Sequence, residues 1–525
     1  MKFVNEQTYE NFFHTNRESE FHKKFEIEIS SLKKQLSDEN IYPIMIENKK
    51  IFSKTKFKHV SPIDKRIILG YISIASDKEI KKAVKSSDIA FKKWALLDYM
   101  KRIAILKKAV IEIRNRKFEL SALLTFENGK NRYEAMADID EAIDFINYYC
   151  FEMEFNNGFV SNNYVKNEKE QYLSVMKPYG VWGIISPFNF PAAIFVGMTT
   201  GALVTGNTVI VKPASNTPII GYKIIEILVK AGIPPGVLNF VTGSGKSIGK
   251  LLVGNRSVAG ILFTGSKEIG SQIVRDSSKI TLRPIIAELG GKNPVIVTGT
   301  ANLDKAVNGV TKAAFSYSGQ KCSACSRVYV HKKVKNEFLT KLIKNVENLN
   351  ISNPVNEESD IGPLINKDAY QKYKQFTKIA SKKGKILFGG SIIQDGELEY
   401  GYYVEPTIVT NISEKSSLAK KELFLPLVIV NEYKNFENAI KMANRSEFGL
   451  TAGIYSNDQR EIDFFLQHIE SGVVYVNRAK GATTGAMVGQ QSFGGWKNSG
   501  TSGKGTGGKY YLSQFMREQS QTILS

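Results

Sequence analysis

Two cysteines in the segment GQKCSACSR, residues 319–327, have the spacing Cys322-x-x-Cys325. Such a pair could be a redox-active disulfide, half of a zinc site, or one catalytic nucleophile with a second cysteine nearby. A zinc site needs further ligands, yet neither Cys150 nor any of the five histidines lies at ligand spacing from the pair. A thioredoxin-like pair would open a helix in a small βαβ domain, whereas this pair lies deep in a long chain. The pattern therefore favours a single nucleophilic thiol.

A second candidate for chemistry is Glu288, which ends the apolar run IIAE and is followed closely by Gly290 and Gly291. A carboxyl group beside apolar neighbours tends to have a raised pKa, which suits a general base. A solvated loop glutamate is the alternative when this residue is taken alone. The two glycines indicate that another group comes close to the backbone here.

Three glycine-rich segments could bind phosphate. Residues 241–247, VTGSGKS, lack the first glycine of a P-loop, and residues 503–510, GKGTGGKY, carry a tyrosine where the Mg²⁺-binding hydroxyl belongs. Residues 260–270, GILFTGSKEIG, run from a predicted strand through Gly265 and Gly270 into a predicted helix. The start of such a helix favours an anion, although ordinary turn chemistry is the alternative.

These segments must be positioned by the alternating elements around them. Short apolar runs, each followed by a helical pattern, predict four successive βα units with strands at 181–185, 208–212, 237–241 and 260–264. This succession predicts a doubly wound parallel sheet, whose ligands bind beyond the carboxyl ends of its strands. A second α/β pattern begins near residue 293. Residues 76–150 have helical periodicity, and residues 158–178 are extended in character.

Composition narrows the class of protein. A chain of 525 residues with 42% hydrophobic residues predicts two or three globular domains. The net charge of +20 is scattered in pairs, without a nucleic-acid-binding module, so no nucleic-acid partner is expected. The N-terminus has no apolar core of a signal peptide, no apolar run reaches the roughly 18 residues of a membrane span, and only three cysteines occur. We expect a cytoplasmic protein without membrane contact.

Six motifs in one order resemble those of the NAD(P)-dependent aldehyde dehydrogenases: SPFNFP (186–191), VIVKPAS (209–215), FTGSKEIG (263–270), ELGGKNP (288–294), GQKCS (319–323) and KELFLPL (421–427). The resemblance covers nearly the whole chain from about residue 40. Residues 319–327 and 483–518 are similar to those of the L-glutamate γ-semialdehyde (1-pyrroline-5-carboxylate) dehydrogenases.

The resemblance implies an α/β aldehyde dehydrogenase-like fold, with a Rossmann-type cofactor domain, an α/β catalytic domain and a small oligomerisation flap. The implied division is an N-terminal helical part of the cofactor domain (1–157), a flap (158–178, with 490–525), a Rossmann-like NAD(P)-binding part (179–287), a catalytic domain (288–480), and a substrate-anchor loop with a C-terminal oligomerisation segment (481–525). Because the family's flap pairs with a neighbouring subunit, a homo-oligomer is expected.

The resemblance also implies a reaction. Cys322 would attack the aldehyde carbon, the Asn189 amide and the Cys322 N–H would stabilise the oxyanion, and Glu288 would activate the water that hydrolyses the thioester. The expected substrate is L-glutamate γ-semialdehyde, oxidised to L-glutamate in proline degradation. Another aldehyde, such as succinate semialdehyde, is the alternative. A non-enzymatic binding protein on the same fold is disfavoured because Cys322, Glu288 and Asn189 are all present.

By the same resemblance, NAD, and also NADP, would be bound by Ser186, Pro187, Phe188, Lys212, Ser215, Gly245, Thr264, Gly265, Ser266, Glu422 and Phe424. The substrate would contact Phe190, Ser323, Gly485, Ala486 and Phe493. No metal is expected. Many NAD-preferring members carry glutamate where this chain has Ser215, and a serine would not repel the 2′-phosphate of NADP. Cys325 is expected to be a buried small residue, with a reversible disulfide to Cys322 as the alternative.

Overall fold

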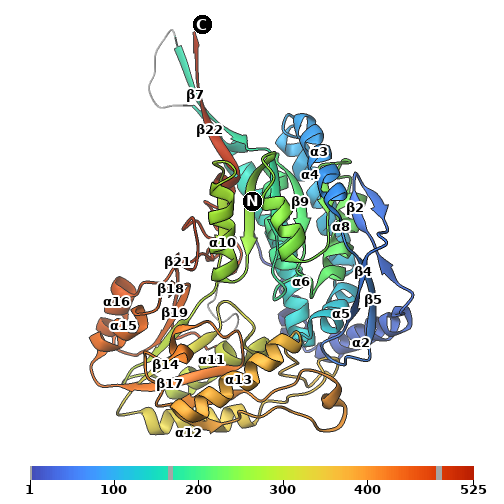
Figure 1. Cartoon of the computed structure of the whole chain (residues 1–525). Coiled ribbons are helices and arrows are strands. Elements are labelled where there is room, and N and C mark those ends of the chain that lie inside the picture. Colours follow the sequence, from blue (N-terminus) through green and yellow to red (C-terminus); the bar gives the residue numbers. More distant parts are fainter. Residues whose placement is uncertain (1–2, 163–169, 480–486, 525) are drawn as a thin grey trace.

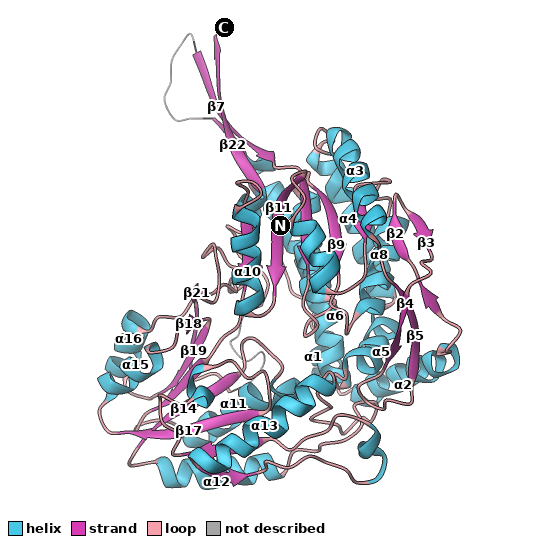
Figure 2. Ribbon diagram, in the orientation of Figure 1, coloured by secondary structure: helices cyan, strands magenta, loops and turns pink. Residues whose placement is uncertain are grey.

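The computed structural model describes residues 3–162, 170–479 and 487–524 of the chain (Figure 1). Two seven-stranded sheets form the centres of its two halves, and helices cover their faces (Figure 2). The predicted combination of two α/β parts is therefore observed. Within the described residues, no helix is long and apolar enough to cross a membrane.

The first sheet has the strand order β12-β11-β8-β9-β10-β2-β3. Strands β12 to β10 are parallel, and β2 and β3 add an antiparallel edge. In the parallel part, the chain enters at β8, runs outward through β9 and β10, and returns to the other side of β8 with β11. The carboxyl ends of β8 and β11 therefore meet where the winding reverses. The strands are β2 (Ile44–Ile46), β3 (Lys49–Ile51), β8 (Val181–Ile185), β9 (Thr208–Lys212), β10 (Leu238–Phe240), β11 (Val258–Thr264) and β12 (Ile285–Glu288).

Apolar sequence explains why the central strands form. β8 and β9 are buried along their whole length, because helices cover both faces of the sheet. The helices of this half are α1 (Thr8–His14), α2 (Glu18–Gln35), α3 (Asp77–Trp94), α4 (Tyr99–Asn115), α5 (Lys117–Asn128), α6 (Arg132–Phe155), α7 (Ala193–Val204), α8 (Pro218–Lys230), α9 (Lys250–Val253) and α10 (Lys267–Ser278). The buried helix α7 packs against α6 at the centre of this half.

The second sheet has the order β15-β16-β17-β14-β13-β19-β20, parallel except for β15. Its strands are β13 (Asn293–Val297), β14 (Cys325–His331), β15 (Lys385–Phe388), β16 (Thr407–Thr410), β17 (Leu427–Tyr433), β19 (Thr451–Tyr455) and β20 (Val473–Val476). Its helices are α11 (Leu303–Phe315), α12 (Lys335–Glu347), α13 (Lys367–Lys383), α14 (Ser417–Lys420), α15 (Phe436–Asn444) and α16 (Gln459–His468).

Three smaller sheets complete the fold. β1 (Ile41–Tyr42), β5 (Ile68–Ser73) and β4 (Lys56–Val60) form one, and β18 (Phe448–Gly449) pairs with β21 (Trp496–Lys497). The third joins β22 (Met516–Leu524), β7 (Glu170–Pro178) and β6 (Val160–Asn162). β7 and β22 pair along their whole length and project from the body as the long ribbon at the top of Figure 1.

The structure differs from the sequence prediction in two places. Residues 41–73 contain five strands that the sequence analysis did not identify, because they are short and several alternate with exposed residues. The helix predicted to follow the strand at 237–241 begins instead as the π-helical turn Gly245–Gly249 and continues as the short α9.

Candidate active site

The carboxyl ends of three neighbouring strands carry most of the predicted cofactor residues. β8 leads into residues 186–191, β9 ends at Lys212, and β11 ends at Thr264. Because β8 lies between β9 and β11, these ends are adjacent in the sheet. Ligands of doubly wound sheets bind at such an edge. The predicted residues gathered here are Ser186, Pro187, Phe188, Lys212, Ser215, Thr264, Gly265 and Ser266.

Lys212 is buried at the end of β9, with 3% of its surface exposed. Its Nζ donates a hydrogen bond to the carbonyl oxygen of Pro213 (2.8 Å), and burial lowers its pKa to about 8. The hydroxyl of Ser215 donates to the carbonyl of Gly243 at 3.4 Å. An ammonium group has three hydrogens to donate, so Lys212 has capacity left for a ligand hydroxyl.

The start of α10 forms the next wall of this edge. Ser266 is its N-cap, and the Ser266 hydroxyl accepts a hydrogen bond from the Ile269 N–H (3.4 Å). The Gly265 N–H donates to the carbonyl of Glu288 (3.1 Å), which ties the end of β11 to β12. At Gly245, another of the predicted cofactor residues, a Cβ would have no other atom within 4 Å. Backbone N–H groups and the dipole at a helix start favour a phosphate.

Glu288 closes β12 and faces the second half of the fold. Its Oε2 is buried and makes no hydrogen bond within the described residues. Burial raises the pKa of the carboxyl to about 8, although a hydrogen bond from the Gly495 N–H lowers it. A buried carboxyl without a cationic partner is well suited to take up and release a proton.

The two glycines after Glu288 allow the close approach that the sequence indicated. The Gly291 N–H donates to Glu422 Oε1 (3.0 Å), and a Cβ on Gly290 would overlap the Glu422 carboxylate. A Cβ on Gly291 would lie 2.7 Å from the carbonyl oxygen of Cys322. Burial raises the pKa of Glu422 to about 7. These glycines therefore bring a carboxylate and the cysteine turn against β12.

Phe188 and Phe424 face one another, one from each half of the fold. Their ring centroids are 5.7 Å apart and their planes form an angle of 73°. Phe424 has a positive φ of 59°, which is uncommon for an aromatic residue. Two aromatic rings in this arrangement can flank a planar ligand ring.

Cys322 lies on a fixed turn before β14. Tyr317 and Ser318 have left-handed φ angles of 48° and 53°, and the Asn293 amide donates to the carbonyl of Cys322 (2.7 Å). A turn that holds non-glycine residues in this region stores strain, which is common at functional sites.

Cys322 is partly buried, unlike Cys150 and Cys325, which are buried. The N–H groups of Ser323 and of Cys322 itself bond to the Cys322 sulfur and lower its pKa, but burial dominates and raises that pKa to about 12. The charges of Glu422 and Glu288 act in the same direction as burial. The group is therefore a neutral thiol at neutral pH until a base or a bound cation assists its ionisation.

Asn189 and Phe190 lie on the loop between β8 and α7. Asn189 is 3% exposed. The loop is held by Asn128, whose side chain donates to the carbonyl of Phe188 (2.6 Å), while the carbonyl of Asn128 accepts the hydroxyl of Tyr317 (3.0 Å). Asn128, which the sequence analysis did not single out, thus connects the Asn189 loop to the turn that carries Cys322.

The sequence did not indicate the buried ion pair that lies against the Phe190 ring. Lys130 is fully buried, and its Nζ donates to Asp138 Oδ2 (2.8 Å). Asp138 Oδ1 accepts the N–H of Ala193 at the start of α7 (2.7 Å). The Lys130 Nζ lies 4.0 Å from the centroid of the Phe190 ring, a cation–π distance. The pair therefore fixes both the ring and the helix that follows it.

Further charges adjoin this pair. Burial, with the nearby charge of Asp138, raises the pKa of Glu141 to about 8. Lys321, which directly precedes Cys322, donates to Glu134 Oε1 on α6 (2.7 Å). The helix α6 thus contacts both sides of the candidate site. In sequence these charges resemble an exposed helix face, so no local pattern announces their burial.

The predicted substrate residues are only partly described. Phe493 forms paired backbone hydrogen bonds with Thr506 (2.9 and 2.8 Å), and the carbonyl of Ser323 accepts the Thr451 hydroxyl (3.4 Å). Gly485 and Ala486 lie outside the described residues.

Cys325 has the environment expected of a small core residue. It is buried at the start of β14, its sulfur donates to the Arg327 carbonyl (3.7 Å), and both it and Cys322 are free thiols. Within the part of the chain that the structure describes, no group of three or more His, Cys, Asp or Glu residues could hold a metal ion.

The chain is similar to known proteins over most of its length. The sequence profile of the aldehyde dehydrogenase family matches residues 50–521. A Bacillus cytotoxicus protein named 1-pyrroline-5-carboxylate dehydrogenase is 38% identical over 486 residues, covering 91% of this chain and 92% of the relative. The structure of 1-pyrroline-5-carboxylate dehydrogenase from Thermus with bound NAD has a TM-score of 0.93 at 33% identity, covering 100% of this chain and 99% of that chain. A 3,6-anhydro-L-galactose dehydrogenase in complex with NAP has a TM-score of 0.86 at 32% identity, covering 92% and 100%.

Proposed function

Because the chain belongs to the aldehyde dehydrogenase family, we propose that it oxidises L-glutamate γ-semialdehyde, the open form of 1-pyrroline-5-carboxylate, to L-glutamate in proline degradation. The observation that carries the proposal is that Cys322 lies near enough to Glu288 for that carboxyl's charge to raise the pKa of the thiol, while Glu288 Oε2 is buried without a hydrogen bond in the described residues. Family membership also confirms the predicted resemblance and fold.

The residues at the edge of the first sheet fit NAD or NADP. Lys212 has donor capacity for a ribose hydroxyl, Gly265 and Ser266 open a helix that favours a pyrophosphate, and Phe188 with Phe424 could flank the nicotinamide ring. A bound dinucleotide would supply the acceptor for the hydride of the substrate carbon. Glu422 Oε1 accepts a hydrogen bond from the Gly291 N–H. The other carboxylate oxygen of Glu422 would bind the nicotinamide ribose.

The chain's own residues account for the covalent steps. The Cys322 thiol gives its proton to solvent and its sulfur adds to the aldehyde carbon, and the Cys322 N–H and the Asn189 amide stabilise the resulting oxyanion. Loss of the hydride leaves a thioester on Cys322. Glu288 takes a proton from water, which attacks the thioester and releases L-glutamate together with the free thiol.

Three described residues are proposed to contact the substrate. Phe190 and Phe493 would line its aliphatic part, and the Ser323 hydroxyl would bind its carboxylate. Phe190 is supported from behind by Lys130, so its ring presents a fixed face. Gly485 and Ala486 are proposed to bind the amino-acid end from the segment outside the described residues.

The proposal includes tolerance of NADP, because Ser215 donates to a backbone carbonyl and adds no negative charge near Lys212. Steady-state kinetics with both dinucleotides test this. A kcat/KM for NADP more than about a thousandfold below that for NAD, or roughly 4 kcal/mol of discrimination, would contradict it.

A homo-oligomer is proposed as the working form. The ribbon of β7 and β22 projects from the body with β22 as an edge strand, and Ile523 and Leu524 on it are exposed. Exposed edge strands favour pairing with another chain. Light scattering after size-exclusion chromatography would give the mass of the assembly.

The substrate assignment is tested by comparing kcat/KM for L-glutamate γ-semialdehyde and succinate semialdehyde, each with NAD. The proposal predicts a preference of at least about tenfold for the amino acid, as expected when a site's polar groups are left unpaired by the smaller compound. Equal kcat/KM values, or a higher value for succinate semialdehyde, would contradict the substrate assignment but not the reaction class.

A further inference from the structure

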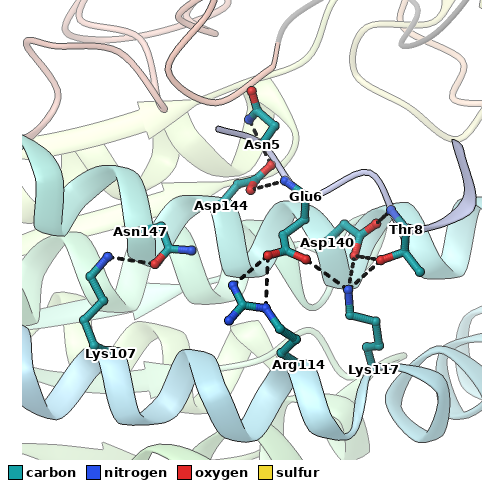
Figure 3. Close-up of polar contacts among 9 residues, drawn as sticks. All are labelled: Asn5, Glu6, Thr8, Lys107, Arg114, Lys117, Asp140, Asp144 and Asn147. Carbon is teal, nitrogen blue, oxygen red and sulfur yellow. Dashed lines mark hydrogen bonds and ion pairs between the residues drawn. The ribbon is translucent and has the colours of Figure 1, made fainter. Parts of the chain in front are cut away.

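The first residues of the chain are fastened to helix α6. In the N-terminal segment, residues 3–8, the Glu6 N–H and the Asn5 Nδ2 donate to Asp144 (2.8 and 2.9 Å), and the Thr8 N–H and hydroxyl donate to Asp140 (2.7 and 2.8 Å) (Figure 3). Asp140 and Asp144 are four residues apart, so both lie on the same face of α6. The segment therefore runs along that face in register with the helix.

Cations from two other helices hold the segment from its other side. Arg114 of α4 donates to Glu6 Oε1 (2.6 Å), and Lys117 of α5 binds both Glu6 Oε2 (3.1 Å) and Asp140 Oδ1 (3.0 Å). Chain termini are ordered only where such contacts tie them down. The N-terminal segment is thus part of the helical layer.

Asn5 also reaches a distant part of the chain. Its Nδ2 donates to the carbonyl of Val488 (2.9 Å), and its Oδ1 accepts the Nε2 of Gln490 (2.8 Å). Together with the bond to Asp144, both amide hydrogens and the amide oxygen of Asn5 are used. One side chain therefore joins α6 to residues 487–491.

Phe3 closes the same contact. Its ring meets the edge of Tyr148 with centroids 5.2 Å apart. Gly489 has a φ of +78°, and a Cβ there would lie 2.8 Å from the Phe3 ring. Residues 487–491 thus contact the N-terminal segment and α6, although Gly489 and Gln490 stay exposed, and only glycine fits at their centre.

These residues lead directly to the candidate active site. The Gly489 N–H donates to the Gly507 carbonyl (2.9 Å), and Phe493 pairs with Thr506 four residues on. Two residues later, the Gly495 N–H bonds to the carboxyl of Glu288. A displacement at residues 487–491 would therefore pass along a short, paired segment to Phe493.

We propose that Asn5 is a positioning residue for the substrate site: it holds residues 487–491 against α6 and thereby sets the position of Phe493. The inference rests on the proposed function, in which Phe493 lines the substrate pocket. Asn5 touches neither substrate nor cofactor, and its effect is exerted through the backbone it holds.

The test is the steady-state kinetics of Asn5→Ala, with Gln7→Ala as the matched control, since Gln7 is an exposed residue of the same segment. Loss of two hydrogen bonds to residues 487–491 predicts a KM for L-glutamate γ-semialdehyde about fivefold to tenfold higher, with kcat changed less than about twofold. Gln7→Ala is expected to match the wild type. A merely structural role would lower the active fraction and leave KM unchanged, which would overturn the inference.

A charge swap provides the conservative rescue. Asn5→Asp places two carboxylates together and should raise KM at least as much as Asn5→Ala. Adding Asp144→Asn lets the new amide donate to the new carboxylate, but an aspartate at residue 5 cannot donate to the Val488 carbonyl. KM should therefore return only part of the way from the Asn5→Asp value toward that of the wild type. If the double variant is no better than Asn5→Asp, the link through Asp144 is wrong.

Failure of the proposed function gives a different result. If the wild type oxidises another aldehyde but not L-glutamate γ-semialdehyde, the substrate assignment fails, and the same variants are compared with the aldehyde that is oxidised. If the wild type oxidises L-glutamate γ-semialdehyde and Asn5→Ala keeps the wild-type KM, the inference alone fails.

Discussion

Two buried carboxyl groups near the candidate site have opposite surroundings. Asp138 is paired at both oxygens, with the Lys130 ammonium and the Ala193 N–H. Glu288 receives a hydrogen bond from the Gly495 N–H but leaves Oε2 buried and without a partner in the described residues. A fully paired buried charge holds structure, whereas an unpaired buried carboxyl is costly to the fold and available for proton transfer. The difference matches the proposed roles, in which Asp138 supports the site and Glu288 takes part in the reaction.

The two cysteines give the same contrast and the largest expected effect. Cys322→Ala removes the sulfur that is proposed to bond to the substrate, so kcat should fall by a factor of about 10⁴ or more. Cys325→Ala, which only trims a buried side chain at the start of β14, should leave kcat within about threefold. Stopped-flow measurement of NADH formation checks both. Comparable losses in the two variants would mean that the thiols act together.

Glu288→Gln sharpens the comparison between the carboxyls. It removes the proposed general base, so kcat should fall by about 10²–10⁴. The variant also lacks a buried group that is costly to ionise. Its free energy of unfolding above neutral pH should therefore equal or exceed that of the wild type. Denaturant titration and turnover of the same preparation measure both. A variant that is both inactive and destabilised would assign Glu288 to structure.

Asp138→Asn should affect stability more than turnover, which is the opposite of Glu288→Gln. Breaking one partner of a buried ion pair typically costs about 3–5 kcal/mol, because Lys130 is left as an uncompensated charge. Residual turnover per folded molecule should be reduced far less than in Glu288→Gln. Lys130→Met with Asp138→Leu, which removes both charges, is the control, and it should recover part of the lost stability.

Much of the fold could be predicted because its signals are local. The apolar runs of β8, β9, β10 and β11 and the helices after them agree with the sequence prediction within a few residues. The strands within residues 41–73 were missed because β1 has two residues and β4 alternates lysines with partly buried positions. Short edge strands are specified mainly by their neighbours, which periodicity does not reveal.

The candidate site divides in the same way. Cys322 and Glu288 stand in motifs that are readable along the chain. The support from Lys130 and Asn5 depends on partners far away in sequence, such as Phe190 for Lys130 and Val488 for Asn5. No local pattern marks such residues, so the structure was needed to find them.

A smaller effect concerns pH. The folded-state pKa of Glu288, about 8, exceeds its ordinary value of 4.5. The wild type should therefore lose stability relative to Glu288→Gln as pH rises from about 4.5 to about 8, since the unfolded chain gives up this proton first. The effect of pH on turnover has the opposite sign. Where thioester hydrolysis limits the rate, kcat of the wild type should rise with pH to a plateau above about 8, and Glu288→Gln should lack that rise.

The most direct test of the account is the intact mass of Glu288→Gln, quenched with acid after mixing with NAD and L-glutamate γ-semialdehyde. With attack intact and hydrolysis slowed, a glutamyl thioester should accumulate on one residue per chain, and peptide mapping should place it on Cys322. The same mixture with Cys322→Ala added to Glu288→Gln should carry none. NADH formation without any adduct, or an adduct on another residue, would contradict the proposed division of work between Cys322 and Glu288.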